Sequence, residues 1–159
     1  MAGKSDATWK KGRGKLGVFA PLLGSWRARA DTDMGPLVCE RTFETMLGDK
    51  YVQLTARWTF ASAKGAKPRA PYQELCLFGP NKEHGLGFWS FTSDGKRSEG
   101  RLFDAADIHP QALCFAAEMD AGFARQAYWP GDDGAVHWCV ESRTKKGWNR
   151  FVEHVYQPG

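Results

Sequence analysis

Six ionisable side chains lie inside segments whose composition favours β-strands, and these residues are the best placed in the sequence to bind or transform a small molecule. They are Arg41, Glu74, Arg125, His137, Glu141 and His154. An unpaired charge is costly to bury, so two of these groups that converge inside a folded domain would pair or bind the polar head of a ligand. The alternative places each of them on the solvated face that a half-buried strand retains.

The spacing of the reactive residues gives little support to metal or nucleophilic chemistry. The histidines lack the HxH and HExxH spacings typical of metal sites, and they stand at positions His84, His109, His137 and His154. His137 and Cys139 share a strand face at i and i+2, but activation of the thiol would need a hydrogen bond between them and partial exposure. No GxSxG elbow is present. We therefore predict no catalytic residue and no metal ligand, and we favour a non-catalytic protein over an enzyme.

The charge of the chain is concentrated at its N-terminus. The formal net charge is +4. Residues 1–15 account for all of it, because they contain one acidic residue, Asp6, and five basic ones: Lys4, Lys10, Lys11, Arg13 and Lys15. Residues 1–15 are also rich in glycine and poor in apolar side chains, which predicts a flexible basic tail ahead of a single domain over residues 16–159. The neutral remainder argues against a nucleic-acid partner.

Hydropathy and cysteine usage indicate the compartment. No apolar run approaches the roughly 20 residues that a membrane-spanning helix needs, and the longest one, residues 16–23, is interrupted by Pro21. The first residues also lack the apolar stretch and cleavage site of a secretory signal. The four cysteines are far apart and form no CxxC pattern, which is typical of reduced thiols in a core: Cys39, Cys76, Cys114 and Cys139. We predict a cytoplasmic protein without a membrane partner.

Alternation of apolar and polar residues with period two runs through most of the chain. In residues 50–60, for example, Val52, Leu54 and Trp58 fall on one face and Thr55 on the other. The same pattern predicts strands over 25–32, 37–47, 50–60, 72–78, 85–92, 96–104, 111–119, 123–129, 135–143 and 148–157.

Tight turns separate most of these strands, and this connectivity predicts the architecture. Consecutive antiparallel strands form a meander, and closing the meander removes its exposed edges. We therefore predict an all-β fold, a closed antiparallel up-and-down β-barrel of about 8–10 strands, preceded by a short helical plug over residues 16–23. A β-sandwich is the structural alternative, although it would prefer longer crossover connections.

Four segments in this order carry a resemblance to a known family. They are residues 19–26 (FAPLLGSW), 40–51 (ERTF running into LGDKY), 87–100 (GFWSFTSDG before EG) and 148–156 (WNRFVEHVY). The first resembles the start of a calycin barrel, in which a helical plug precedes a Gly-x-Trp sequence that opens the first strand. Over about residues 17–157 the chain resembles a bacterial family of calycin-like domains, related in shape to lipocalins, fatty-acid-binding proteins and nitrobindins.

The resemblance implies structural roles for Gly24, Trp26 and Arg150. Gly24 allows a sharp bend from plug to strand, and Trp26 can seal the closed end of the barrel. In calycins a basic residue of the last strand packs across that tryptophan. Arg150 is the residue to which the resemblance gives this role, with a cation–π contact and hydrogen bonds to carbonyls of the plug.

The side chains that point into a barrel decide which ligand it accepts. Small residues along the predicted wall, such as Ala56 and Ala124, leave room for a guest, and Tyr72 follows a long loop over 61–71 that places it near a mouth. We predict a small apolar or amphipathic molecule, with a carboxylate met by Arg41 or Arg125. The predicted ligand-binding residues are Arg41, Phe43, Trp58, Tyr72, Glu74, Trp89, Arg125 and His137.

Two other interpretations of the barrel stay open at the level of sequence. We predict no cofactor, and the alternative is haem held, as the resemblance to nitrobindins implies, by His154 or His137. In the second alternative the barrel is filled and serves as an interaction module, presenting Phe123, Trp129 or Trp148 to a second subunit in a homodimer.

Overall fold

The computed structural model describes residues 7–33, 35–61 and 69–159, and most of these residues belong to β-strands. Helical structure in the described residues is limited to two short 3₁₀ segments, η1 (Gly17–Leu22) and η2 (Asp132–Gly134). The strands are β1 (Gly24–Thr32), β2 (Gly35–Met46), β3 (Tyr51–Phe60), β4 (Tyr72–Asn81), β5 (Gly85–Thr92), β6 (Arg97–Phe103), β7 (Leu113–Met119), β8 (Gly122–Pro130), β9 (Val136–Thr144) and β10 (Gly147–Pro158).

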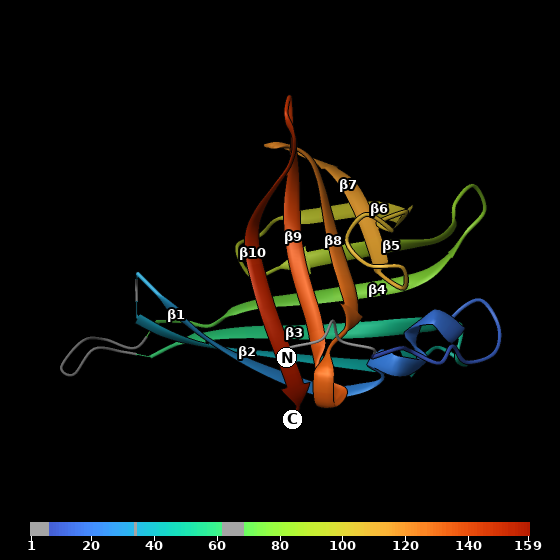
Figure 1. Ribbon diagram of the computed structural model, residues 1–159, viewed down its shortest axis with the longest axis horizontal. Helices are drawn as coiled ribbons and strands as arrows, with labels where there is room; N and C mark the ends of the chain where they lie inside the picture. The colour runs from blue at the N-terminus through green and yellow to red at the C-terminus, as the bar shows by residue number, and fades with distance from the viewer. Residues whose placement is uncertain (1–6, 34, 62–68) are drawn as a thin grey trace, which may run out of the picture.

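The strands close into a barrel (Figure 1). Each strand pairs antiparallel with its neighbours in sequence, and β1 also pairs with β10, which completes the ring. This order confirms the predicted closed, antiparallel, up-and-down all-β barrel. The β1–β10 seam is short, because its paired residues are Trp26 with Pro158 and Arg27 with Gln157, whereas β2 and β3 pair along nearly their whole length.

The predicted plug is the 3₁₀ segment η1, which lies at the end of the barrel where β1 begins. The Phe19 ring packs against those of Phe78 and Phe115, whose centres lie 4.9 and 6.0 Å from its own. The indole Nε1 of Trp26 donates a hydrogen bond of 2.7 Å to the carbonyl of Leu22, so the first strand is tied to the plug. Gly24, between them, has a φ of +119°, a conformation that side chains with a Cβ rarely adopt.

The chain ahead of the plug also contacts the barrel. The backbone N–H of Trp9 donates to Oε1 of Gln111, and Nε2 of Gln111 donates back to the carbonyl of Trp9, at 2.8 and 3.0 Å. The Trp9 side chain packs against the main core. These contacts hold residue 9 against the barrel, and residues 1–6 lie outside the described residues. The division into a flexible basic tail over residues 1–15 and a domain over residues 16–159 stays a prediction.

A smaller apolar cluster lies on the outer face of the barrel, beneath the connection between β6 and β7. The connection contributes Ala105, and the strands contribute Cys114, Ala127 and Cys139, all of them buried. All four cysteines are free thiols. Burial raises the pKa of Cys139 to about 11 and that of Cys114 to about 12, so these thiols stay protonated and act as small apolar side chains.

None of the helical segments in the described residues has the length and apolar composition needed to cross a lipid bilayer.

Candidate functional site

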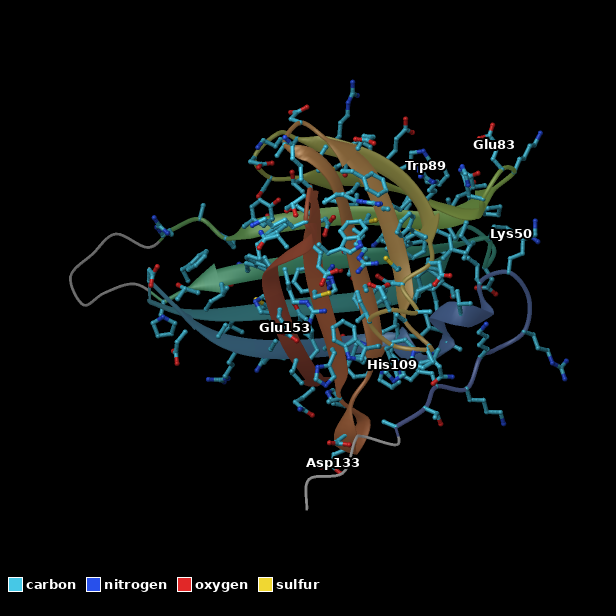
Figure 2. The ribbon with its side chains drawn as sticks, turned by 45° about the horizontal axis from the view of Figure 1, so that its top comes forward. Lys50, Glu83, Trp89, His109, Asp133 and Glu153 are labelled. Atoms are coloured by element: carbon cyan, nitrogen blue, oxygen red, sulfur yellow. The ribbon has the colours of Figure 1, made fainter. Side chains whose placement is uncertain are left out.

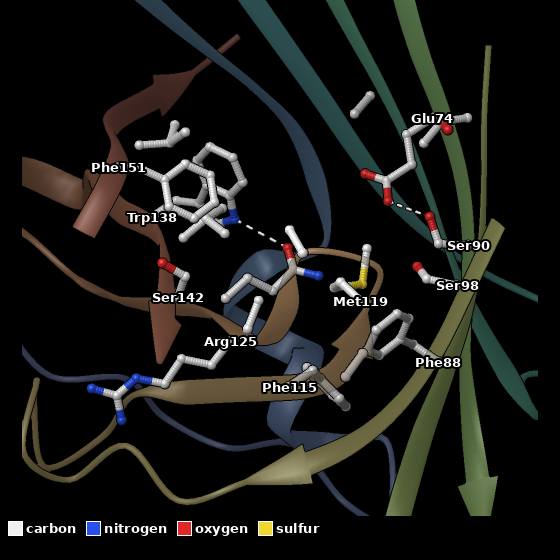
Figure 3. Close-up of a pocket in the computed structure, with 18 of the residues that line it drawn as sticks. Glu74, Phe88, Ser90, Ser98, Phe115, Met119, Arg125, Trp138, Ser142 and Phe151 are labelled. Atoms are coloured by element: carbon white, nitrogen blue, oxygen red, sulfur yellow. Dashed lines mark hydrogen bonds between the residues drawn. The ribbon is translucent and has the colours of Figure 1, made fainter. Parts of the chain in front are cut away.

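A cavity of about 410 Å³ lies inside the barrel, and strands β2 to β10 all contribute to its wall. Thr92 and Met119, the last residues of β5 and β7, and Gly122, the first residue of β8, line the part of the cavity that lies farthest from η1. Figure 3 shows the cavity with side chains from its wall. Its volume falls within the range of about 300–1,000 Å³ typical of pockets for small molecules. The interior of this barrel is therefore not completely filled by its own side chains.

Apolar side chains form most of the cavity wall. Aromatic rings come from Phe88, Phe115 and Trp138, and the small side chains of Ala117 and Ala124 leave the space between them open. The opposite, closed half of the barrel is filled by rings packed on one another, with Phe78 and Phe115 4.8 Å apart between centres. Large side chains near the plug and small ones nearer the mouth thus explain why the void lies in one half of the barrel.

Arg41 provides a buried positive charge in the cavity wall. Its place on β2 between Cys39 and Phe43, which are also buried, follows from the alternation of the strand. Its Nη2 donates to the hydroxyl of Tyr128 at 2.7 Å, and its guanidinium carbon lies 4.5 Å from the centre of the Trp138 ring. Its Nε is buried and has no hydrogen-bond partner among the described residues. The guanidinium therefore retains an unused donor.

Glu74, on β4, supplies the negative charge opposite Arg41. One carboxylate oxygen lies 3.8 Å from Nη2 of Arg41, and the other accepts a hydrogen bond from the hydroxyl of Ser90, drawn in Figure 3. A separation of 3.8 Å is longer than a hydrogen bond. The two charges thus balance each other across the cavity wall without using up each other's hydrogen-bonding groups.

The Arg41 guanidinium is charged, and apart from Glu74 the ionisable groups packed against it are neutral at ordinary pH. Burial opposes the charge on Arg41, but the electrostatic influence of Tyr128, Tyr156 and Glu74 outweighs it and raises the guanidinium pKa. Burial also raises the pKa of Tyr128, and it raises that of Tyr156 to about 12. Burial, with a smaller contribution from Arg41, lowers the pKa of His154, which favours a neutral imidazole. Apart from Glu74, the cation therefore faces hydroxyl and imidazole groups that carry no charge.

His154 does not present its imidazole to the cavity. Its ring packs against those of Trp58 and Trp138, at 5.4 and 5.3 Å between centres, and its Nδ1 lies 3.4 Å from the Tyr156 hydroxyl. His137, the other candidate for haem, stacks on Trp129 at 5.3 Å, on the opposite face of β9 from Trp138. Neither ring is part of the cavity wall. This placement gives no support to haem held inside the cavity, and the haem alternative stays a prediction.

The predicted ligand-binding residues fall into two sets. The cavity wall contains Arg41, Trp58, Tyr72 and Glu74. Phe43 lies in the core, with its ring edge-on to that of Tyr128 at 5.5 Å. Trp89, which is labelled in Figure 2, lies on the outer face of β5. Its neighbours Phe88 and Ser90 line the cavity, and adjacent residues of a strand point to opposite faces. His137 is likewise on the outer face, as described above.

Arg125 borders the cavity, but its guanidinium points away from it (Figure 3). Its Nε donates to Glu141 at 2.8 Å, and its two terminal nitrogens donate to the two oxygens of Asp107 at 3.0 and 2.7 Å. The ring of Trp148 lies 4.0 Å from the guanidinium carbon. All these partners are on the outer side of the barrel, so the charge of Arg125 is used there.

Arg150 also belongs to this outer group. Its Nε donates to Glu141 at 2.9 Å, its Nη1 donates to Glu153 at 3.1 Å, and its guanidinium carbon lies 5.4 Å from the centre of the Trp129 ring. The resemblance implied a contact with Trp26 instead. In the structure β10 reaches Trp26 only at Pro158, so Arg150 lies too far back along the strand for that role.

The uncharged polar residues of the cavity are not among the ligand-binding residues predicted from the sequence. Ser90, Ser98 and Gln126 line it, and Oε1 of Gln126 accepts a hydrogen bond of 3.2 Å from Nε1 of Trp138. The signal was available for Ser90, because it stands two residues from Phe88 and shares its face. It was ambiguous, since apolar residues occupy both faces of β5.

The comparisons with known proteins add no assignment to this geometry. No protein-family model matches the chain, and no curated protein sequence aligns significantly with it. Within the described residues, no group of three or more His, Cys, Asp or Glu side chains is arranged to hold a metal ion.

Proposed function

We propose that this protein binds a small, partly apolar molecule inside its β-barrel and does not transform it. The observation that carries the proposal is the 410 Å³ cavity, whose mainly apolar wall contains one polar pole formed by Arg41 and Glu74. Pockets of this kind hold the body of a ligand by apolar contact and fix its orientation with a few polar groups. The fold resembles that of calycins, and kinship with that group, as well as a cytoplasmic location, is part of the proposal.

The outer face of the barrel supports a second role less strongly. Phe123 and Trp148 are half-buried and contact each other with ring centres 6.0 Å apart, and Trp129 is stacked on His137. These contacts already occupy much of the surface that a partner would cover. Association into a homodimer through Phe123, Trp129 and Trp148 stays a prediction, and binding inside the barrel is the function that we favour.

Blocking the cavity tests the proposal. Ala117 lies on the inner face of β7 and lines the cavity, so Ala117→Phe would place a ring in the space that a ligand needs. The neutral dye N-phenyl-1-naphthylamine, whose fluorescence rises in apolar surroundings, is a suitable probe. We expect saturable binding to the wild-type protein with one site, and an affinity lower by at least about tenfold in Ala117→Phe.

The next residue along the strand provides the matched control. Glu118 is exposed on the outer face of β7, so Glu118→Phe adds the same ring to the same strand outside the cavity. We expect this variant to bind the dye as the wild type does, and circular dichroism checks that both variants are folded. Equal affinity in Ala117→Phe and Glu118→Phe, or dye binding that does not saturate, would contradict the proposal. Independently of the dye, native mass spectrometry of the protein purified from its own host would identify any molecule bound to the barrel.

A further inference from the structure

The charges around the cavity limit the chemistry of its ligand. Among the described residues that line it, the charged side chains are Arg41, Glu74 and Arg125. The guanidinium of Arg125 is bonded to Asp107 and Glu141 outside. The cavity itself therefore contains one cation and one anion, which balance each other before any ligand enters.

The hydrogen-bonding groups of this pair are only partly used. Nε of Arg41 is a buried donor without a partner in the described chain. The Arg41–Glu74 distance of 3.8 Å is longer than a hydrogen bond, so neither group uses its hydrogen-bonding atoms on the other. An unpaired buried donor carries a free-energy penalty that a ligand acceptor would remove. The pole thus offers a donor and an acceptor side by side.

A charged ligand would disturb the balance. A carboxylate placed against Arg41 would bring a second negative charge next to Glu74, in a site where apolar walls weaken solvent screening. An ammonium group would meet the positive charge of Arg41 in the same way. An uncharged head that accepts a hydrogen bond from Arg41 and donates one to Glu74 satisfies both groups without adding charge.

We propose, building on the proposed function, that the cavity selects uncharged ligands in which a carbonyl acceptor stands beside an N–H donor, such as a carboxamide or lactam, on an aromatic body. The carbonyl accepts from Arg41 and the N–H donates to the Glu74 carboxylate. The aromatic body lies against Phe88, Phe115 and Trp138, which form the apolar wall. This class replaces the carboxylate that the sequence suggested.

Two probes of nearly the same shape test this selectivity. Calorimetric titration of the full-length protein near neutral pH compares 2-naphthamide, which is uncharged, with 2-naphthoate, which carries a carboxylate. We expect the amide to bind at least about tenfold more tightly to the wild-type protein. In Glu74→Gln the competing negative charge is absent, so we expect naphthoate affinity to rise by at least about tenfold and the preference for the amide to shrink by the same factor.

Glu40→Gln is the matched control, since Glu40 precedes Arg41 on β2 but is paired with Arg27 on the outer face. We expect it to leave both affinities unchanged. Equal binding of the two probes to the wild type, tighter binding of naphthoate, or no binding of naphthamide where N-phenyl-1-naphthylamine binds would each overturn the inference and leave the proposed function standing. Failure of all three probes to bind would overturn the proposed function itself.

Discussion

The barrel contains two buried arginines whose surroundings differ in one decisive respect. Arg125, on the outer face, uses Nε and both terminal nitrogens in hydrogen bonds to Glu141 and Asp107. Arg41, on the inner face, donates a hydrogen bond to Tyr128 and stands 3.8 Å from Glu74, and its Nε is without a partner in the described residues. The guanidinium in the outer cluster uses all three of its nitrogens in hydrogen bonds, whereas the one in the inner pair has a nitrogen without a partner among the described residues.

This difference separates a structural charge from a binding charge. A buried ion pair repays the cost of removing its charges from water only when its hydrogen bonds are well made. The outer cluster meets that condition, and Asp107 also fixes the connection between β6 and β7 to the barrel wall. The inner pair does not meet it, which is expected of a site completed by a ligand. Proteins commonly accept such local deficits where function needs them.

Glu141→Gln gives the largest effect that this comparison predicts. Glu141 accepts hydrogen bonds from Arg125 and Arg150, and its side chain is only 7% exposed. Loss of its charge leaves the buried Arg125 with Asp107 alone, and we expect the free energy of unfolding to fall by about 3 kcal/mol in urea denaturation. Glu153→Gln is the control, because Glu153 is half-exposed and its side chain forms a surface ion pair with Arg150; it should cost about 0.5 kcal/mol. Similar losses in the two variants would show that the outer cluster is not a buried network.

Arg41→Met sharpens the contrast from the inner side. Removal of Arg41 leaves Glu74 without its opposite charge and Tyr128 without this hydrogen bond, and the loss of a poorly bonded buried charge offsets these effects only in part. Because the Glu74 side chain is 19% exposed and can still be hydrated, we expect the free energy of unfolding to fall by about 1 kcal/mol, and binding of 2-naphthamide to be lost. Arg125→Met, measured beside it, should cost several times more stability and leave the affinity for 2-naphthamide unchanged. If Arg41→Met destabilises the protein as much as Arg125→Met does, Arg41 is a structural residue and the comparison fails.

The fold could be predicted from the sequence because local signals agree along its whole length. Alternation sets the strands, and turn residues such as Gly95 and Gly122, both with positive φ, separate them. Where the pattern is clean, as on β3, the inner face is also predicted, and Trp58 lies on it as expected. For Arg41 on β2 the sequence left both faces open, and the structure turns it inward. The plug was expected as a helix and is a 3₁₀ segment, which is common for one or two turns that contain a proline.

The site could be predicted only in part, since it depends on neighbours far apart in sequence. β5 has apolar residues on both faces, so sequence alone could not decide between Phe88 and Trp89, and the structure turns Phe88 inward. Arg125 and His137 face outward, where Arg125 is paired with Asp107 and His137 stacks on Trp129. The local sequence around Arg125 and His137 does not predict these contacts. The charge balance between Arg41 and Glu74 likewise appears only when β2, β3 and β4 are placed side by side.

Acid pH provides the smallest and most specific test of the comparison. The hydrogen bonds from Arg125 hold the pKa of Asp107 below its ordinary value, against a smaller opposing effect of burial. A carboxyl with a lowered folded pKa stabilises the protein at pH values above its unfolded pKa of about 3.9, and this contribution disappears as the pH falls through the folded value. Since the Asp107 side chain is 59% exposed, solvent screens the interaction and the contribution is below about 1 kcal/mol.

Asp107→Asn therefore separates from the wild type only where the carboxylate is ionised. We expect the variant to be less stable than the wild type near neutral pH, and the two urea midpoints to converge as the pH is lowered below the folded pKa of Asp107. Asp104→Asn is the control, because Asp104 lies in the same connection and accepts a hydrogen bond only from the nearby Ala106 N–H in the described structure. A difference in urea midpoint between wild type and Asp107→Asn that persists or widens in acid would mean that Asp107 stabilises the protein through packing. The ionic contribution to the outer cluster would then come from Glu141 rather than from both carboxylates.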